Sequence, residues 1–181
     1  PRNTKSIIDN LIAACEPSRS LGFGVSGQKL PAISGFLQVI ELEPGSEVKL
    51  DGMTVRCCEN THFSSAEDGS AEAVSLAYRF DLADRAILFT GDSGPSKNME
   101  ALGKGVDLVI GEMLDVDMTM ELIAKSGMDY TADWLVHMKE HLETHHLGPE
   151  QLGQLAQAVG AKQLVAVHIA RAYVNQDNQQ T

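Results

Sequence analysis

Two histidines and one aspartate stand where metal ligands would be expected. His62, Asp92 and His168 each lie at or shortly after the end of a short apolar run that predicts a β-strand. Because ligands of α/β sheets gather at strand ends, we expect the three side chains to lie close together in space. A set of two imidazoles and one carboxylate suits zinc or a similar first-row ion. Taken one at a time, a histidine at a strand end is more often a hydrogen-bonded structural residue, and Gly-Asp after a strand is often a turn with a helix cap.

The elements that would carry these residues begin with a helix and a series of short strands. Apolar side chains at helical spacing predict a helix capped by Thr4 or the residue before it and stopped at Glu16-Pro17-Ser18. Short β-type runs separated by turns predict a β-meander over residues 36–59, with a first strand at 36–42. Asp51-Gly52 predicts a tight hairpin within this meander.

The rest of the chain changes from paired strands to alternating helices and strands. The predicted elements are strands at 75–82 and 85–90, a helix starting near Lys97, a strand at 106–112, helices at 117–126, 131–143 and 149–159, and a strand at 164–168. Strands first, then alternating strand and helix, indicate an α/β layered domain.

The composition excludes several classes of protein. With 43% hydrophobic and 22% charged residues among 181, the chain resembles a globular domain, and no apolar run approaches the ~18 residues that a membrane span needs. Lys and Arg number 14 against 25 Asp and Glu, and the net charge of −11 disfavours nucleic acid as a partner. The three cysteines have no disulfide or metal spacing and are expected to be reduced. No secretion-signal pattern opens the chain, which favours the cytoplasm over the periplasm without deciding between them.

The stretch around Asp92 carries the strongest resemblance to a known family. It reads AILFTGDSGPS over residues 86–96 and continues as LGKGVDLVIGEM over residues 102–113. This combination resembles the metallo-β-lactamase-fold hydrolases, especially their ribonuclease Z-like and arylsulfatase-like branch. In that family the aspartate of the Thr-Gly-Asp loop bridges two metal ions, so the resemblance implies this role for Asp92.

A second match lies near the end of the chain. HHLGPEQLG at residues 145–153, followed by LVAVH at 164–168, is similar to a family pattern with two functional histidines. One of them precedes a helix, and the other binds metal at the end of the next strand. The resemblance therefore implies a functional role for His146 and a metal-ligand role for His168.

A third match is followed by a departure from the family. ENTHF at residues 59–63, leading into SLAYRF at 75–80, is similar to the family's histidine and the strand after it, and implies that His62 is a metal ligand. The family's HxHxDH segment, which supplies the other ligands, appears nowhere in the 181 residues. We expect the chain to be part of a longer protein. The alternative is a domain that has lost catalysis.

A second departure concerns Glu112 and its partner. Ribonuclease Z-like proteins often have His-Glu-Ala where this chain has Gly111-Glu112-Met113, and they pair that motif with a downstream histidine. Glu112 and His146 match, so we expect His146 to donate a proton or stabilise an oxyanion while Glu112 orients its ring. The alternative for His146 is a surface histidine near a helix cap. A separate metal site at His137 and His141, four apart in a predicted helix, is less favoured than a solvated helix face.

The resemblance implies an αββα sandwich, of which residues 1–181 form a single partial domain comprising the C-terminal half and a little more. It implies two divalent metal ions, Zn²⁺ first and Mn²⁺ or Fe as alternatives. The expected activity is hydrolysis of a small-molecule ester, such as a phosphodiester or sulfate ester, by metal-activated water, although these 181 residues alone should be inactive. The alternatives are a ribonuclease Z-like tRNA-processing endonuclease and a non-catalytic interaction domain of the same fold. We expect no membrane partner, and open apolar surface would favour a homo-oligomer.

Overall fold

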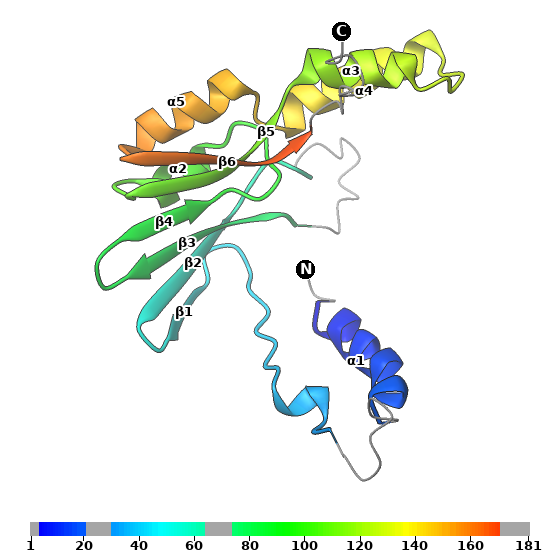
Figure 1. The fold of residues 1–181 in the computed structure, drawn as a ribbon. Coiled ribbons are helices and arrows are strands. Elements are labelled where there is room, and N and C mark those ends of the chain that lie inside the picture. Colours follow the sequence, from blue (N-terminus) through cyan, green and yellow to red (C-terminus); the bar gives the residue numbers. More distant parts are fainter. Residues whose placement is uncertain (1–3, 21–29, 64–73, 171–181) are drawn as a thin grey trace, which may run out of the picture. The chain divides into compact units, whose positions relative to one another are not determined.

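A computed structural model describes residues 4–20, 30–63 and 74–170 of the chain (Figure 1). The chain divides into two compact units, Pro1–Glu43 and Pro44–Thr181. Among the described residues, no helix combines the length and the apolar character needed to cross a bilayer.

The first unit contains helix α1, Thr4–Ser20, and a short 3₁₀ helix η1, Ile33–Gly35. The backbone N–H of Ile33 donates to Glu16 Oε1 at 2.6 Å, which ties the two elements together. The sequence predicted that α1 would stop around Pro17, but the helix runs to Ser20. A proline removes one helical hydrogen bond to the carbonyl four residues earlier, yet the residues after it still have N–H groups that can complete a last turn.

The strand predicted at residues 36–42 is wrong, because this stretch is irregular. A strand is stabilised by hydrogen bonds to a neighbouring strand, and none of the described strands pairs with this segment. Its large side chains Phe36, Leu37 and Ile40 are exposed. The β-meander is therefore confined to the residues that follow Pro44.

The second unit is built on one six-stranded sheet whose strands lie in chain order. The strands are β1 (Glu47–Leu50), β2 (Met53–Glu59), β3 (Leu76–Leu82), β4 (Ala86–Phe89), β5 (Leu108–Leu114) and β6 (Gln163–Ala170). The pairs from β1 to β4 are antiparallel, whereas β4, β5 and β6 run parallel. The predicted hairpin at Asp51-Gly52 is confirmed, with Gly52 at φ 74° as such a turn requires.

The described part of the second unit also contains four helices: α2 (Lys97–Gly103), α3 (Val116–Lys125), α4 (Ala132–His145) and α5 (Pro149–Val159). Helices α2 and α5 pack against each other and against the same face of the sheet (Figure 1). Helices α3 and α4, which come between β5 and α5 in the chain, form a hairpin that extends beyond the end of the sheet. Each of the helices α2, α3 and α4 begins at a polar cap, where Ser96, Asp115 and Thr131 accept a backbone N–H. The α/β layered domain predicted from the element order is confirmed.

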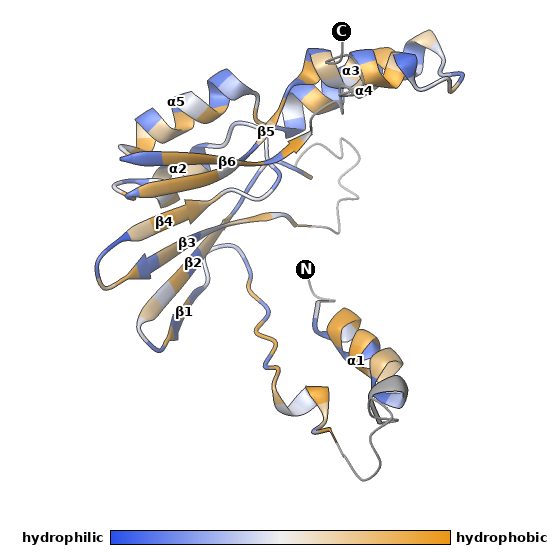
Figure 2. Cartoon of the chain, in the orientation of Figure 1, coloured by the Kyte–Doolittle hydropathy of each residue, from blue (hydrophilic) through white to orange (hydrophobic). Residues whose placement is uncertain are grey.

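The core lies between the sheet and helices α2 and α5. Its buried members include Leu88, Met99, Val109, Leu147 and Leu152. The parallel strands β4, β5 and β6 are hydrophobic along most of their length (Figure 2), so both faces of this part of the sheet carry apolar side chains.

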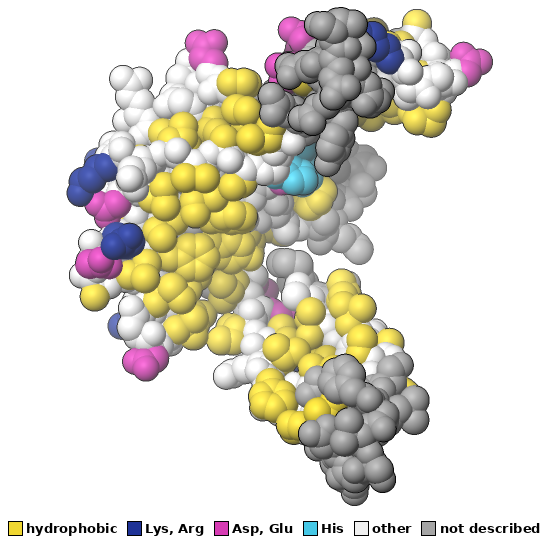
Figure 3. All heavy atoms as spheres, in the orientation of Figure 1, with side chains coloured by type: hydrophobic (Ala, Val, Ile, Leu, Met, Phe, Trp, Pro, Cys, Tyr) yellow, Lys and Arg dark blue, Asp and Glu magenta, His cyan; other side chains and the backbone are white. Residues whose placement is uncertain are grey.

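The opposite face of the sheet is apolar as well. Strand register places Tyr78, Phe89, Ile110 and Val165 in one row on this face. Phe89 and Val165 remain 38% and 46% exposed, and Figure 3 shows hydrophobic side chains gathered over the strands. None of the described strands packs against this face to form a second sheet.

Candidate metal and catalytic centre

The candidate site lies where several strands end at one edge of the sheet. Strands β4, β5 and β6 are parallel, and β2 runs in the same direction because two antiparallel pairings separate it from β4. Segments that leave the carboxyl ends of these strands therefore meet at this edge. The side chains of Asp92, Glu112 and His146 bring one potential ligand atom each to within 4.8 Å of one another.

His168 approaches the same place from strand β6. Its Nε2 lies 3.6 Å from Asp92 Oδ2, although 76 positions separate the two residues. His168 has φ 48°, a left-handed conformation that is uncommon outside glycine, and the β5–β6 register is irregular between Glu112 and Leu114. Strained backbone of this kind clusters at functional sites, where it re-aims a side chain.

His62 lies three positions after the end of β2, against His146. Its ring centroid is 5.0 Å from that of His146 and 4.6 Å from that of Phe63. His62 Nδ1 is 3.4 Å from the backbone oxygen of His145. A carbonyl oxygen only accepts, so this contact assigns the proton to Nδ1 and leaves the lone pair of Nε2 for a metal ion.

Buried Glu112 and partly buried His146 form a hydrogen-bonded pair. His146 Nδ1 lies 2.9 Å from Glu112 Oε2, and Glu112 Oε1 accepts the backbone N–H of Ser93. The Glu112 carboxylate is 2% exposed, so both of its oxygens have partners inside the protein. The sequence predicted that Glu112 would orient the ring of His146, and the hydrogen bond confirms that the two side chains are in contact. The chemical roles of the two residues stay predictions.

The carboxylate also affects the protonation of the imidazole. The hydrogen bond that His146 donates to Glu112 raises the pKa of His146 above its ordinary value, and burial opposes this increase. The negative charges of Glu112 and Asp92 add to it. The raised pKa keeps His146 protonated to a higher pH than a free imidazole, and a proton donor must carry its proton.

The alternative metal site on helix α4 gains no support. His137 is exposed and lies 3.6 Å from Asp133 and 3.5 Å from Glu140. His141 instead lies beside the candidate site, with its ring centroid 4.7 Å from that of His145. Burial and the neighbouring imidazoles lower the pKa of His141. Across the described residues, the metal-ligating group of three is the one formed by Asp92, Glu112 and His146.

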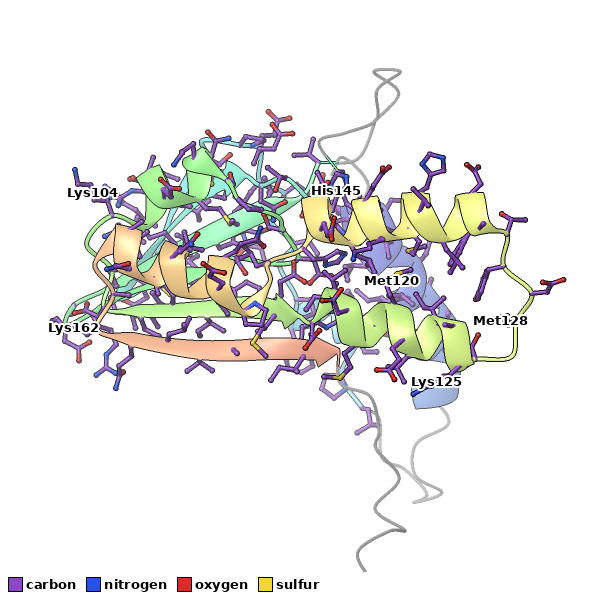
Figure 4. The ribbon with its side chains drawn as sticks, turned by 90° about the horizontal axis from the view of Figure 1, so that it is seen from above. Lys104, Met120, Lys125, Met128, His145 and Lys162 are labelled. Atoms are coloured by element: carbon purple, nitrogen blue, oxygen red, sulfur yellow. The ribbon has the colours of Figure 1, made fainter. Side chains whose placement is uncertain are left out.

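Sequence reasoning missed several polar residues that hold the site together. Asn60, Thr61 and Ser93 are adjacent to predicted ligands and make side-chain hydrogen bonds between segments. His145, at the end of α4 (Figure 4), points Nδ1 at the carbonyl oxygen of Thr61 at 2.8 Å. Asparagine, threonine, serine and histidine residues are common in loops, so these four residues did not stand out in the sequence. Only their position near His62, Asp92 and His146 could have suggested a role.

The residues present fit a divalent metal ion. Asp92 offers carboxylate oxygens, and His62 and His168 offer imidazole nitrogens, which are donors that zinc accepts. Glu112 is committed to His146 and Ser93, so it is better suited to orienting a neighbour than to binding the ion.

Gly111 is constrained by packing. A Cβ atom there would collide with the side chain of Leu152 and lie 3.4 Å from Thr90 Cγ2. The histidine that ribonuclease Z-like proteins often have at this position would not fit this core.

Comparison with known proteins gives the family. The model of the Beta-lactamase superfamily domain matches residues 19–169, which span parts of both compact units. The prediction that residues 1–181 form one partial domain stays a prediction. Among the curated proteins, none matches the chain.

Solved structures are similar at low identity. The metallo-beta-lactamase fold protein YhfI from Bacillus subtilis is 16% identical, with a TM-score of 0.48 over 72% of this chain and 42% of that one. The short form of human tRNase Z is 18% identical, with a TM-score of 0.43 over 67% of this chain and 38% of that one. Zn²⁺-bound PqqB from Methylobacterium extorquens is 14% identical, with a TM-score of 0.46 over 71% and 44%. The chain thus spans less than half the length of these three proteins. By its match to the family model, the chain belongs to the beta-lactamase superfamily of metallo-β-lactamase-fold proteins.

Proposed function

We propose that this chain is part of a metal-dependent hydrolase that cleaves a small ester, such as a phosphodiester or sulfate ester. The observation that carries the proposal is the meeting of Asp92, Glu112 and His146 within 4.8 Å, with His168 3.6 Å from Asp92. Hydrolytic metal sites are commonly built from carboxylate and imidazole groups that separate segments of the chain bring together.

In this proposal, each residue has one task. His62, Asp92 and His168 would hold divalent metal, which when bound supplies a water acidic enough to act as hydroxide near neutral pH. Glu112 accepts the Nδ1 proton of His146 and fixes the orientation of the ring. His146 then presents Nε2, whose proton can pass to the leaving oxygen of the ester or stabilise negative charge on it.

The tRNA-processing alternative is supported by one feature, the hydrogen-bonded pair of Glu112 and His146. Two observations oppose it. Only 30 positions separate His62 from Asp92, where the ribonuclease Z-like branch commonly inserts a long tRNA-binding arm. The net charge of −11 also repels a phosphate backbone. A small ester is therefore the favoured substrate.

The test compares the 181-residue chain with a version extended upstream to include an HxHxDH segment. Bound metal is measured by mass spectrometry, and hydrolysis with an aryl phosphodiester, an aryl sulfate and a precursor tRNA. We expect the extended protein to bind metal and cleave one of the small esters, and Asp92→Asn to abolish both. Asp117→Asn, at an exposed position on α3, is the matched control.

The possible outcomes separate the three hypotheses. Cleavage of precursor tRNA with no turnover of small esters supports the endonuclease. A folded extended protein that binds no metal and cleaves nothing supports the non-catalytic domain, and overturns the proposal.

A further inference from the structure

Asn60 is a buried polar residue that has no role in the proposed reaction. It lies directly after β2 and is 2% exposed. Its Nδ2 donates to the backbone oxygens of Thr90, at 2.9 Å, and Asp92, at 3.0 Å. Its Oδ1 accepts the backbone N–H of His62 at 3.2 Å. Since carbonyl oxygens only accept and an N–H only donates, these partners assign the orientation of the amide.

These three hydrogen bonds connect segments that the sheet does not pair directly. Strand β2, which leads to His62, is separated from β4, which leads to Asp92, by strand β3. The Asn60 backbone N–H donates to the backbone oxygen of Ser75, just before β3, at 3.0 Å, while its side chain reaches across to the loop after β4. One carboxamide therefore spans a strand and joins the segments of two proposed metal ligands.

The loop after β4 is shaped to receive this side chain. Gly91 has φ 62°, which favours glycine. A Cβ atom at this position would lie 3.2 Å from the Leu76 oxygen and 3.5 Å from Asn60 Nδ2. The contact with the Leu76 oxygen is the tighter of the two, so the absence of a side chain at Gly91 lets the Asp92 loop lie close against β3, beside the amide.

Neighbouring contacts extend the connection to the third segment of the site. Thr61 contacts Ser93 Oγ through its hydroxyl, at 3.2 Å, and its N–H, at 3.3 Å. The Thr61 backbone oxygen lies 2.8 Å from His145 Nδ1, next to His146. The Ser93 backbone N–H in turn donates to Glu112. The segment from Asn60 to His62 is thus linked to the Asp92 loop and to the end of α4.

We infer that Asn60 is a positioning residue that fixes the separation of His62 and Asp92 for a shared metal ion. Among the side chains of its length, asparagine alone has two N–H donors for the two carbonyls and an oxygen for the His62 N–H. Partners behind metal ligands hold them in geometry, and losing one typically costs about 10- to 100-fold in metal affinity. The inference rests on the metal site of the proposed function, although it does not depend on the substrate.

The decisive variant is Asn60→Asp, which keeps the shape of the side chain. The aspartate retains an oxygen that accepts the His62 N–H. Its second carboxylate oxygen replaces the NH₂ group, so it repels the Thr90 and Asp92 carbonyl oxygens to which Nδ2 donates. The added negative charge would by itself tighten cation binding. If Asn60 acts by positioning, Zn²⁺ affinity should instead fall about 10- to 100-fold. The matched control is Asn98→Asp, because exposed Asn98 donates through Nδ2 only to the Glu59 oxygen, at 3.3 Å.

Zn²⁺ affinity of the 181-residue chain and its variants is measured by calorimetry, alongside the unfolding temperature without metal. A merely structural Asn60 would lower the unfolding temperature and leave the Zn²⁺ affinity of the folded protein unchanged, and that result would overturn the inference. Equal losses in Asn60→Asp and Asn98→Asp would do the same. If the unmodified 181-residue chain binds no Zn²⁺, the same variants are compared in the extended protein of the proposed function. An extended protein that binds no Zn²⁺ overturns the metal site of the proposed function, which is a different result.

A measurement on the unmodified chain covers the case in which Asn60→Asp does not fold. In nitrogen-15 NMR spectra, the Asn60 side-chain amide protons should exchange slowly with solvent, and their resonances should shift when Zn²⁺ is added. The Asn98 side-chain amide should exchange quickly and stay in place. Asn60 resonances that do not respond to bound Zn²⁺ contradict a positioning role.

Discussion

His146 Nδ1 lies 2.9 Å from Glu112 Oε2, although 34 positions separate the two residues. The pairing depends on the α3–α4 hairpin, which leaves the sheet after β5 and returns the chain to the same edge. The backbone N–H of Leu114 donates to the Leu147 oxygen at 2.9 Å, which closes the base of this hairpin. The hairpin thus delivers an imidazole to a carboxylate that strand β5 holds in place.

Replacing Glu112 with glutamine should weaken the site without changing its size. The amide can no longer accept from both Ser93 and His146 as a charged group, so the ring loses its fixed orientation. In a protein extended to include the HxHxDH segment, metal affinity or activity should fall about 10- to 100-fold. The measurement is metal titration together with ester hydrolysis, with Glu121→Gln on the exposed face of α3 as the control. Unchanged turnover and metal content would contradict the orienting role of Glu112.

The stability of the fold should depend on pH through His146. Its pKa is raised in the folded state, mainly by the Glu112 hydrogen bond, so protonation stabilises the native protein. This contribution is fully present below the unfolded pKa of about 6.5 and is lost as the pH rises through the folded pKa. His141, whose pKa is lowered mainly by burial, acts in the opposite direction.

Urea unfolding separates the contributions of His146 and His141 to stability. It is measured for the wild type and for His146→Gln from about pH 5.5 to about pH 8.5, around the ordinary histidine pKa. The stability advantage of the wild type over His146→Gln should shrink as the pH increases. His141→Gln should show the reverse trend, gaining most over the wild type at the acidic end. An advantage that grows with pH for His146 contradicts the assigned ion pair.

Local signals account for most of the elements that the sequence predicted correctly. Caps such as Ser96, Asp115 and Thr131 and the periodicity of α5 are properties of a few neighbouring residues, so helix positions were predicted to within a few residues. The failure at residues 36–42 has the opposite cause. An apolar, β-type stretch forms a strand only when a neighbouring strand can pair with it. The sequence of the stretch does not reveal whether such a neighbour exists.

The residues of the candidate site also fall into two groups, those that the sequence predicted and those that it did not. Asp92, Glu112 and His146 stood out because their motifs match a family pattern. Asn60 and Ser93 carry no such mark, since an asparagine or serine near a turn is ordinary. Their importance lies in contacts to residues 19 to 32 positions away, which only the folded chain reveals. Likewise, the clash of a Cβ atom at Gly111 with Leu152 depends on helix packing.

Gly94 should be essential to the close packing of the site. A Cβ atom there would collide with the backbone oxygen of Thr144 near the end of α4, and would lie 3.1 Å from Thr61 Oγ1. Backbone cannot move aside as a flexible side chain can, so Gly94→Ala should lower the free energy of unfolding by about 1–3 kcal/mol. Gly153→Ala is the control, because a Cβ atom at this position of α5 meets nothing within 4 Å. It should stabilise the helix by about 0.5–1 kcal/mol, and both changes are measured by urea denaturation.

The open face of the sheet should make the 181-residue chain self-associate. Val165 is 46% exposed in an apolar row with Phe89, and exposed apolar patches promote association. Val165→Thr should shift the sedimentation profile toward the monomer at equal concentration. Val136→Thr, which changes a 56% exposed valine on α4, should leave the profile as it is. Equal effects of the two variants would place the association elsewhere.

The number of available ligands should make metal binding by these 181 residues weak. Zinc sites ordinarily combine at least three protein ligands with water. If Asp92 bridges two ions, the first retains only His62 and Asp92, and the second only Asp92 and His168, because no HxHxDH segment occurs in the sequence. We therefore expect calorimetry to detect weak Zn²⁺ binding, and assays with aryl phosphodiesters or esters to detect no turnover. An upstream extension that restores the segment should bring both tight metal binding and hydrolysis. Stoichiometric tight binding and comparable turnover by the 181 residues alone would show that they already build a complete site.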